Sequence, residues 1–126
     1  MTENKLSNEI IGLAIQVHSI LGPGLLESAN EKAMIFELNN NGYHIRVQSL
    51  LPIHYKSLKI DEGFRADIIV NNKIILELKS VKKIEDIHSK QLLTYLRLSN
   101  LKLGLLINFN ETLLKNGIKR IINGII

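Results

Sequence analysis

The sequence predicts an α/β domain in which helices pack against a mixed β-sheet. Segments of helical periodicity and segments rich in β-branched and aliphatic residues follow one another in the order α-α-β-β-β-α-β-β. A strand–helix–strand unit near the end indicates one parallel crossover within the sheet. The length of 126 residues fits a single domain over residues 1–126.

The first two elements are predicted to be helices. Residues 5–21 place apolar side chains at helical spacing on one face, and the sequence Gly-Pro-Gly at 22–24 should end this helix. A second helix is expected over residues 25–40, with Gly42 as its C-cap. The remaining elements are an extended segment over 43–56 that ends near the turn-prone sequence 55–63, a hairpin over 64–80, a helix over 85–99 with Asp86 as its N-cap, a buried strand over 101–109 and an edge strand near 117–123.

The composition is that of an ordinary globular protein, with 45% apolar and 22% charged residues. The absence of cysteine excludes disulfides and thiolate metal sites, so a metal would need oxygen or imidazole ligands. The four histidines show no ligand spacing and are given no metal role.

The polar N-terminus has no signal pattern and no apolar run spans a membrane, so we expect a cytoplasmic protein with no membrane association. A net charge of +4 favours an anionic partner such as nucleic acid.

The hairpin over residues 64–80 carries charges on strands that otherwise suit a core. Asp67 lies in its first strand, and Glu77 and Lys79 lie on one face of its second. If residues 71–73 form a three-residue loop, Asp67 lies opposite Glu77. A two-residue turn would instead place Asp67 opposite Leu76, unless a bulge corrected the register.

Two facing carboxylates repel each other, and a divalent cation would reverse the sign of that interaction. Mg²⁺ binds one or two carboxylates, a backbone carbonyl and waters, and Lys79 could assist the nucleophile or stabilise charge on a phosphate. The alternative is a solvated salt-bridge cluster on an exposed hairpin. The near-continuous apolar runs around the charges favour strands that are covered on both faces, and hence a functional site.

Five sequence blocks surround these charges in order: "GPGLLES", "FRADIIV", "ILELKS", "QLLTYLRL" and "LGLLINFN". Together they resemble the PD-(D/E)xK nuclease superfamily, and in particular the small branch named for its GxxExxY motif, over residues 8–123. It implies a PD-(D/E)xK nuclease-like core, a mixed sheet of four or slightly more strands flanked by helices. It also implies that Asp67, Glu77 and the Leu78 carbonyl bind Mg²⁺ or Mn²⁺ and that Lys79 is the catalytic lysine.

The same resemblance implies catalytic roles for three helix residues. Glu27 matches a helix-borne acid, and Gln91 and Tyr95 match a Q-x-x-x-Y pair behind the site. Without the resemblance, Glu27 would only complement a helix dipole, and the other two would be ordinary residues at the core edge. Asn30 replaces the tyrosine of the GxxExxY motif and is expected at the rim of the site, since it follows Glu27 by three residues.

The combined hypothesis is a Mg²⁺-dependent nuclease that hydrolyses phosphodiester bonds of nucleic acid, expected to be DNA. The alternative is a non-catalytic nucleic-acid-binding or scaffolding domain that retains the fold. With no further domain to supply specificity, a homodimer or a separate partner protein is expected to do so. Four basic residues beyond the hairpin either solvate the surface or contact the phosphate backbone: Lys82, Lys83, Lys90 and Arg97.

Overall fold

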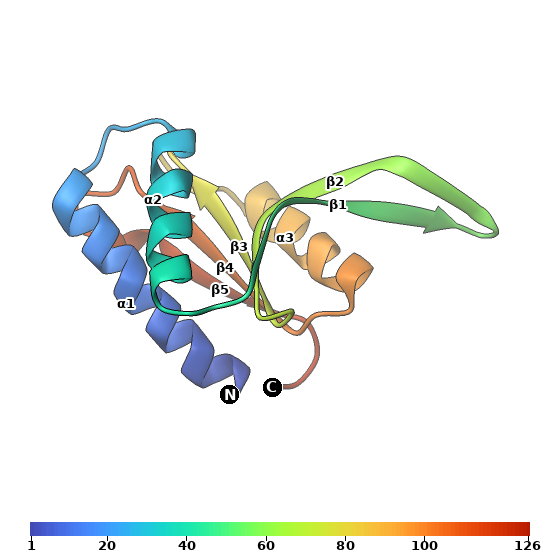
Figure 1. The fold of residues 1–126 in the computed structure, drawn as a ribbon. Coiled ribbons are helices and arrows are strands. Elements are labelled where there is room, and N and C mark those ends of the chain that lie inside the picture. Colours follow the sequence, from blue (N-terminus) through green and yellow to red (C-terminus); the bar gives the residue numbers. More distant parts are fainter.

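The computed structural model describes the backbone of residues 1–126 and the side chains of all of them except Glu62. The elements follow the predicted order, with a short 3₁₀ helix added before the last strand (Figure 1). Their bounds are α1 Glu3–Leu21, α2 Glu27–Asn40, β1 Ile45–Tyr55, β2 Leu58–Val70, β3 Ile74–Lys79, α3 Asp86–Ser99, β4 Leu103–Asn108, η1 Leu114–Gly117 and β5 Ile118–Ile122.

The five strands form one mixed sheet in the order β1-β2-β3-β4-β5. β3 and β4 are parallel, and the other neighbouring strands are antiparallel. α3 connects β3 to β4 and is the crossover that two parallel neighbours require. The predicted crossover and the edge position of β5 are therefore confirmed.

Helices cover both faces of the central strands. α1 and α2 lie on one face and α3 lies on the other (Figure 1). Leu6 and Ile10 of α1 belong to the core that contains Leu76 of β3, whereas Leu92 of α3 belongs to the core that contains Ile75. Because β3 and β4 have a core on each side, their sequences are nearly continuous apolar runs rather than alternating ones.

The ends of the helices follow local backbone chemistry. α1 stops at Gly22, whose φ of 73° breaks the helix. α2 ends in a Schellman motif, in which Gly42 has a φ of 79° and the Tyr43 N–H donates to the Leu38 carbonyl at 3.1 Å. The C-cap itself is Asn41, so the expected C-cap at Gly42 was wrong by one residue, and Gly42 is the left-handed residue that follows it.

The N-cap of α3 is Glu85, so the prediction of Asp86 was wrong by one residue. The Glu85 side chain accepts the His88 N–H, and the Glu85 N–H donates to Nδ1 of His88 at 3.0 Å. This reciprocal pair satisfies two N–H groups at the start of the helix, and Asp86 becomes its first residue.

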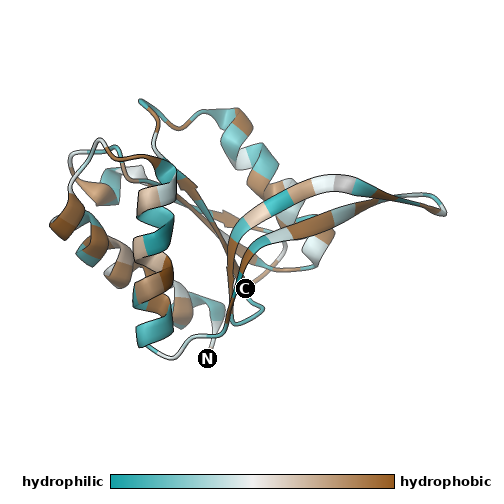
Figure 2. Cartoon of the chain, turned by 45° about the horizontal axis from the view of Figure 1, so that its top comes forward, coloured by the Kyte–Doolittle hydropathy of each residue, from teal (hydrophilic) through white to brown (hydrophobic). Residues whose placement is uncertain are grey.

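β1 and β2 continue past the rest of the sheet as a two-stranded arm, residues 49–66 (Figure 1). The turn predicted over residues 55–63 was too long, because only Lys56 and Ser57 lie between the strands. Lys56 takes a φ of 54°, which lets the chain reverse within two residues. Hydrophilic and hydrophobic residues alternate along both strands, as expected for strands with one solvated face (Figure 2).

Candidate active site

The loop between β2 and β3 brings Asp67 opposite Glu77. Three residues, 71–73, separate the strands, and Asn71 and Asn72 take φ values of 52° and 54°. The strand pairing runs from Val70 with Ile74 to Ile68 with Leu76, where it ends, and the same register continued by one residue brings Asp67 opposite Glu77. The three-residue alternative is therefore the correct one, and asparagine is suited to it because its side chain tolerates this left-handed conformation.

At this point β2 and β3 separate. Hydrogen bonds from backbone N–H groups to side-chain carboxylates take the place of the backbone hydrogen bonds between the strands. The Leu78 N–H donates to Oδ2 of Asp67 at 2.9 Å, and the Asp67 N–H donates to Oε1 of Glu77 at 3.1 Å. Glu77 is 6% exposed and Asp67 is half-buried. The two carboxylates thus lie together at the point where the strands open.

The environment disfavours two negative charges at this point. Burial, followed by the charge of Asp67, raises the pKa of Glu77 to about 8. Burial also raises the pKa of Asp67, although its hydrogen bond from Leu78 and the charge of Lys79 act in the opposite direction. A cation held between the carboxylates would offset this cost.

The oxygen atoms at the opening suit a hard divalent cation. The Lys79 carbonyl accepts the Phe109 N–H at 2.9 Å, so the polar backbone groups of Lys79 face β4. Because successive strand residues face opposite neighbours, the Leu78 carbonyl faces the β2 side, where the Asp67 carboxylate lies. Within the described side chains there is no group of three or more His, Cys, Asp or Glu residues that could hold a metal. Two carboxylates, one carbonyl and waters match the coordination habits of Mg²⁺.

Lys79 and Glu27 border this opening from two elements. Lys79 is half-buried at the end of β3, and its charge acts on both carboxylates. Glu27 is the first residue of α2, and its Oε1 accepts the Ser80 N–H at 3.2 Å. Glu27 also raises the pKa of Asp67 through its charge. It therefore lies beside the end of β3 and not in bulk solvent.

α3 supplies the other side of the site. Tyr95 is 6% exposed, and burial together with the charges of Glu77 and Asp67 raises its pKa to about 12. Its ring also packs against Phe64, with 4.7 Å between ring centroids. Gln91 is half-buried one helical turn before Tyr95, nearer the end of β3.

Asn30 does not lie at the rim, so that expectation was wrong. It is 1% exposed, and its Nδ2 donates only a long 3.5 Å hydrogen bond to the Leu26 carbonyl. Its Oδ1 is buried without a hydrogen-bond partner. Positions three residues apart differ by about 60° around a helix axis, which is enough to leave Glu27 exposed beside the end of β3 while Asn30 is turned into the protein.

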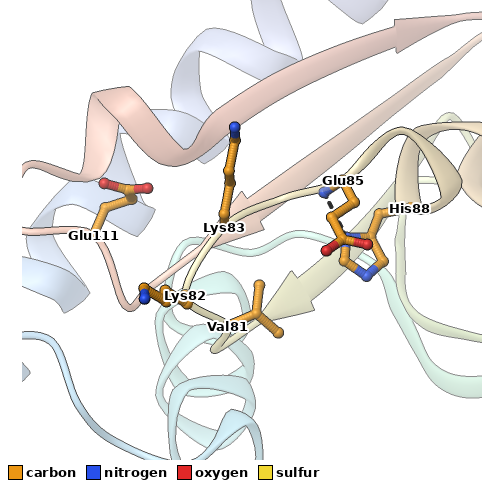
Figure 3. A pocket seen from close by; sticks show the side chains of 6 residues that line it. All are labelled: Val81, Lys82, Lys83, Glu85, His88 and Glu111. Atoms are coloured by element: carbon orange, nitrogen blue, oxygen red, sulfur yellow. Dashed lines mark hydrogen bonds between the residues drawn. The ribbon is translucent and has the colours of Figure 1, made fainter.

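The segment after β3 is basic and is held in place by Asn108. The Asn108 side chain accepts the Val81 N–H at 3.1 Å and donates to the Val81 carbonyl at 2.9 Å. Lys82 and Lys83 follow, and both are exposed. They line an open pocket together with Val81, Glu85, His88 and Glu111 (Figure 3).

Sequence reasoning missed three residues around the site. Asn108 ends an apolar run and its amide could have been noticed there, since a buried amide needs partners. Gln48 lies opposite Asp67 on β1, and its Nε2 donates to Oδ1 of Asp67 at 3.3 Å and to Oε2 of Glu31 at 3.0 Å. Neither Gln48 nor Glu31 carries a local signal, because their meeting depends on the β1–β2 register.

The protein is thus an α/β domain with a mixed sheet, helices on both faces and a carboxylate pair beside Lys79. A family model described as the PD-(D/E)XK nuclease superfamily matches residues 4–121. The chain belongs to this superfamily.

No match is found among curated proteins or among solved structures. Membership of a nuclease superfamily implies a nucleic-acid substrate, and nucleases of this superfamily generally use divalent metals. Of the helices described, none is long and apolar enough to cross a membrane.

Proposed function

We propose that this protein is a Mg²⁺- or Mn²⁺-dependent nuclease of the GxxExxY branch that hydrolyses phosphodiester bonds of DNA. The observation that carries the proposal is the meeting of Asp67 and Glu77 where β2 and β3 separate, with Lys79 beside them. A buried carboxylate pair is costly unless it binds a cation, and membership of the superfamily supports that use.

In this proposal, Asp67, Glu77 and the Leu78 carbonyl hold the metal. Bound there, the cation would neutralise the carboxylates and polarise water and phosphate. Lys79 stabilises the negative charge that develops on the phosphate during attack. Glu27, Gln91 and Tyr95 border the same space and orient the groups that react.

The test is a cleavage assay with Mg²⁺ or Mn²⁺ on single-stranded, duplex and branched DNA and on RNA. We expect the wild type to cut a DNA substrate. Lys79→Ala should lower the cleavage rate by at least about 10²-fold and leave DNA affinity nearly unchanged, because Lys79 acts mainly on charge formed in the transition state. Asp67→Ala should lose metal affinity as well as cleavage, because it removes a ligand.

Lys102→Ala is the matched control, because Lys102 is exposed just before β4, at the opposite end of the parallel pair β3–β4. It should cut DNA at the wild-type rate. If every substrate is bound and none is cut, and Lys79→Ala behaves as the wild type does, the nuclease proposal fails and a binding or scaffolding role replaces it.

A further inference from the structure

Gln48 has an unusual backbone for a strand residue. Its φ is 51°, a left-handed value that non-glycine residues rarely take. The pairing of β1 with β2 is regular on both sides, Val47 with Ile68 and Ser49 with Ala66, so Gln48 lies opposite Asp67. A conformation of this kind persists only where surrounding contacts hold it.

The contacts that hold Gln48 converge on its side-chain amide. Nε2 donates to Oε1 and Oε2 of Glu31 at 3.1 and 3.0 Å, and to Oδ1 of Asp67 at 3.3 Å. The backbone carbonyl of Gln48 accepts from Nη1 of Arg65 at 3.3 Å. Because carboxylates only accept hydrogen bonds when ionised, the nitrogen of the amide must be the atom that faces them.

This arrangement holds both oxygens of Asp67. Oδ2 accepts the Leu78 N–H at 2.9 Å, and Oδ1 accepts from Gln48. A neutral amide donates a hydrogen bond to one carboxylate oxygen and leaves the negative charge of the carboxylate in place. A lysine at this position would cancel that charge. Each oxygen keeps a second lone pair free for a further partner.

We propose that Gln48 is a positioning residue that, held from behind by Glu31 of α2, orients the Asp67 carboxylate for metal binding. This inference rests on the proposed function, because it assigns to Asp67 the role of a ligand. Partners that orient a ligating carboxylate typically change metal affinity 10- to 100-fold when they are removed. The link also couples α2 to β1 and β2, so three elements fix one carboxylate.

The deciding variant is Gln48→Gly. Glycine adopts a φ of 51° without steric cost, so the backbone should keep its course and the free energy of unfolding should not fall. We expect Mn²⁺ affinity, measured by calorimetry on the whole protein without nucleic acid, to fall roughly 10- to 100-fold. Gln48→Asn should show the same loss, because asparagine tolerates the backbone but is one methylene too short to reach both carboxylates.

Lys56→Gly is the matched control, since Lys56 has a φ of 54° at the tip of the arm and the same strain is relieved there. It should bind Mn²⁺ as the wild type does. Glu31→Gln should weaken Mn²⁺ binding less than Gln48→Gly, because Gln48 keeps Asp67 as an acceptor. The double variant Glu31→Gln/Gln48→Gly should bind Mn²⁺ no more weakly than Gln48→Gly alone, because both changes remove the same connection between Glu31 and Asp67.

A second measurement separates positioning from general damage. The Leu78 amide resonance in an NMR spectrum without metal reports the hydrogen bond to Asp67, and it should shift in Gln48→Gly but not in Lys56→Gly. Wild-type Mn²⁺ affinity in Gln48→Gly would overturn the inference and leave the nuclease proposal standing. If the wild type binds Mn²⁺ through Asp67 but cuts no nucleic acid, the proposed activity fails, while the Gln48 comparison still decides the positioning role.

Discussion

At the scale of single residues, Glu77 is the group whose charge costs the fold most. Its carboxyl has an ordinary pKa of 4.5 and a pKa of about 8 in the folded protein. Between these values the unfolded chain has released its proton and the folded protein retains it. The free energy of unfolding should therefore fall as the pH rises through this range, by at most about 1.4 kcal/mol per pH unit.

We predict that Glu77→Gln removes this slope in the presence of EDTA. At pH 8 and above, the variant should be more stable than the wild type by a few kcal/mol, roughly what the cited shift implies. Well below pH 4.5 the two should be equally stable, because Glu77 is then protonated in both states. Denaturant unfolding across this range measures the difference. Glu37→Gln on α2, outside the site, should retain the wild-type slope, and a slope that persists in Glu77→Gln would show that Glu77 is not its source.

The same scale shows what sequence could predict of the site. Asp67, Glu77 and Lys79 were visible because charges interrupt apolar strands, where they need a partner or a use. Their meeting depended only on the length of one loop. Gln48 and Glu31 were not predicted, because they reach the site through long-range pairing and an unusual φ that no local pattern announces.

At the scale of elements, the arm owes its shape to a bulge at Gly63. Between the pairs Leu51–Phe64 and Ile53–Ile60, β1 contains one intervening residue and β2 contains three. A Cβ on Gly63 would lie 2.0 Å from the Leu51 carbonyl oxygen, so β1 passes directly over this residue. The extra residues bend β2 and turn the arm away from the sheet.

Gly63→Ala should destabilise the protein by about 1–3 kcal/mol, because backbone must move to admit the methyl group. Gly12→Ala should change the stability in the opposite direction. Gly12 is an exposed residue of α1 with nothing within 4 Å of an added Cβ, so alanine should stabilise the protein by about 0.5–1 kcal/mol. Urea unfolding of both variants checks the pair, and an unchanged stability in Gly63→Ala would mean that the bulge relaxes freely.

The arm also explains the largest error in the predicted elements. Residues 55–63 contain serine, aspartate and glycine, which favour turns, yet Leu58 and Ile60 alternate with polar residues in the two-residue period of a strand. The alternation was the stronger signal. The one-residue error in the N-cap of α3 has a different cause. Glu85 and His88 form a capping pair, and N-cap preferences for single residues do not favour glutamate.

At the scale of the whole molecule, the charges are arranged around the site in two zones. Carboxylates occupy the opening between β2 and β3, and the exposed Lys82 and Lys83 follow on the segment that Asn108 holds. Since Asn108 fixes the backbone at Val81, this positive charge stays close to the end of β3. In the proposed function, Lys82 and Lys83 are the exposed cations placed beside the site to contact a phosphate backbone.

We predict that the double variant Lys82→Ala/Lys83→Ala binds duplex DNA more weakly and with a flatter salt dependence. Losing two phosphate contacts should reduce the slope of log K against log salt concentration by about 1.8, since each contact contributes about 0.9. Fluorescence anisotropy between about 50 and 200 mM salt, on a Lys79→Ala background with EDTA, measures binding without cleavage.

The matched control is Lys5→Ala/Lys102→Ala, which removes the same charge from α1 and from the segment that precedes β4. It should change the slope far less, because the proposed site lies at the end of β3 that carries Lys79, whereas Lys102 lies at the opposite end of the β3–β4 pair. Equal losses in the two double variants would show that net charge, and not the position of Lys82 and Lys83, governs binding.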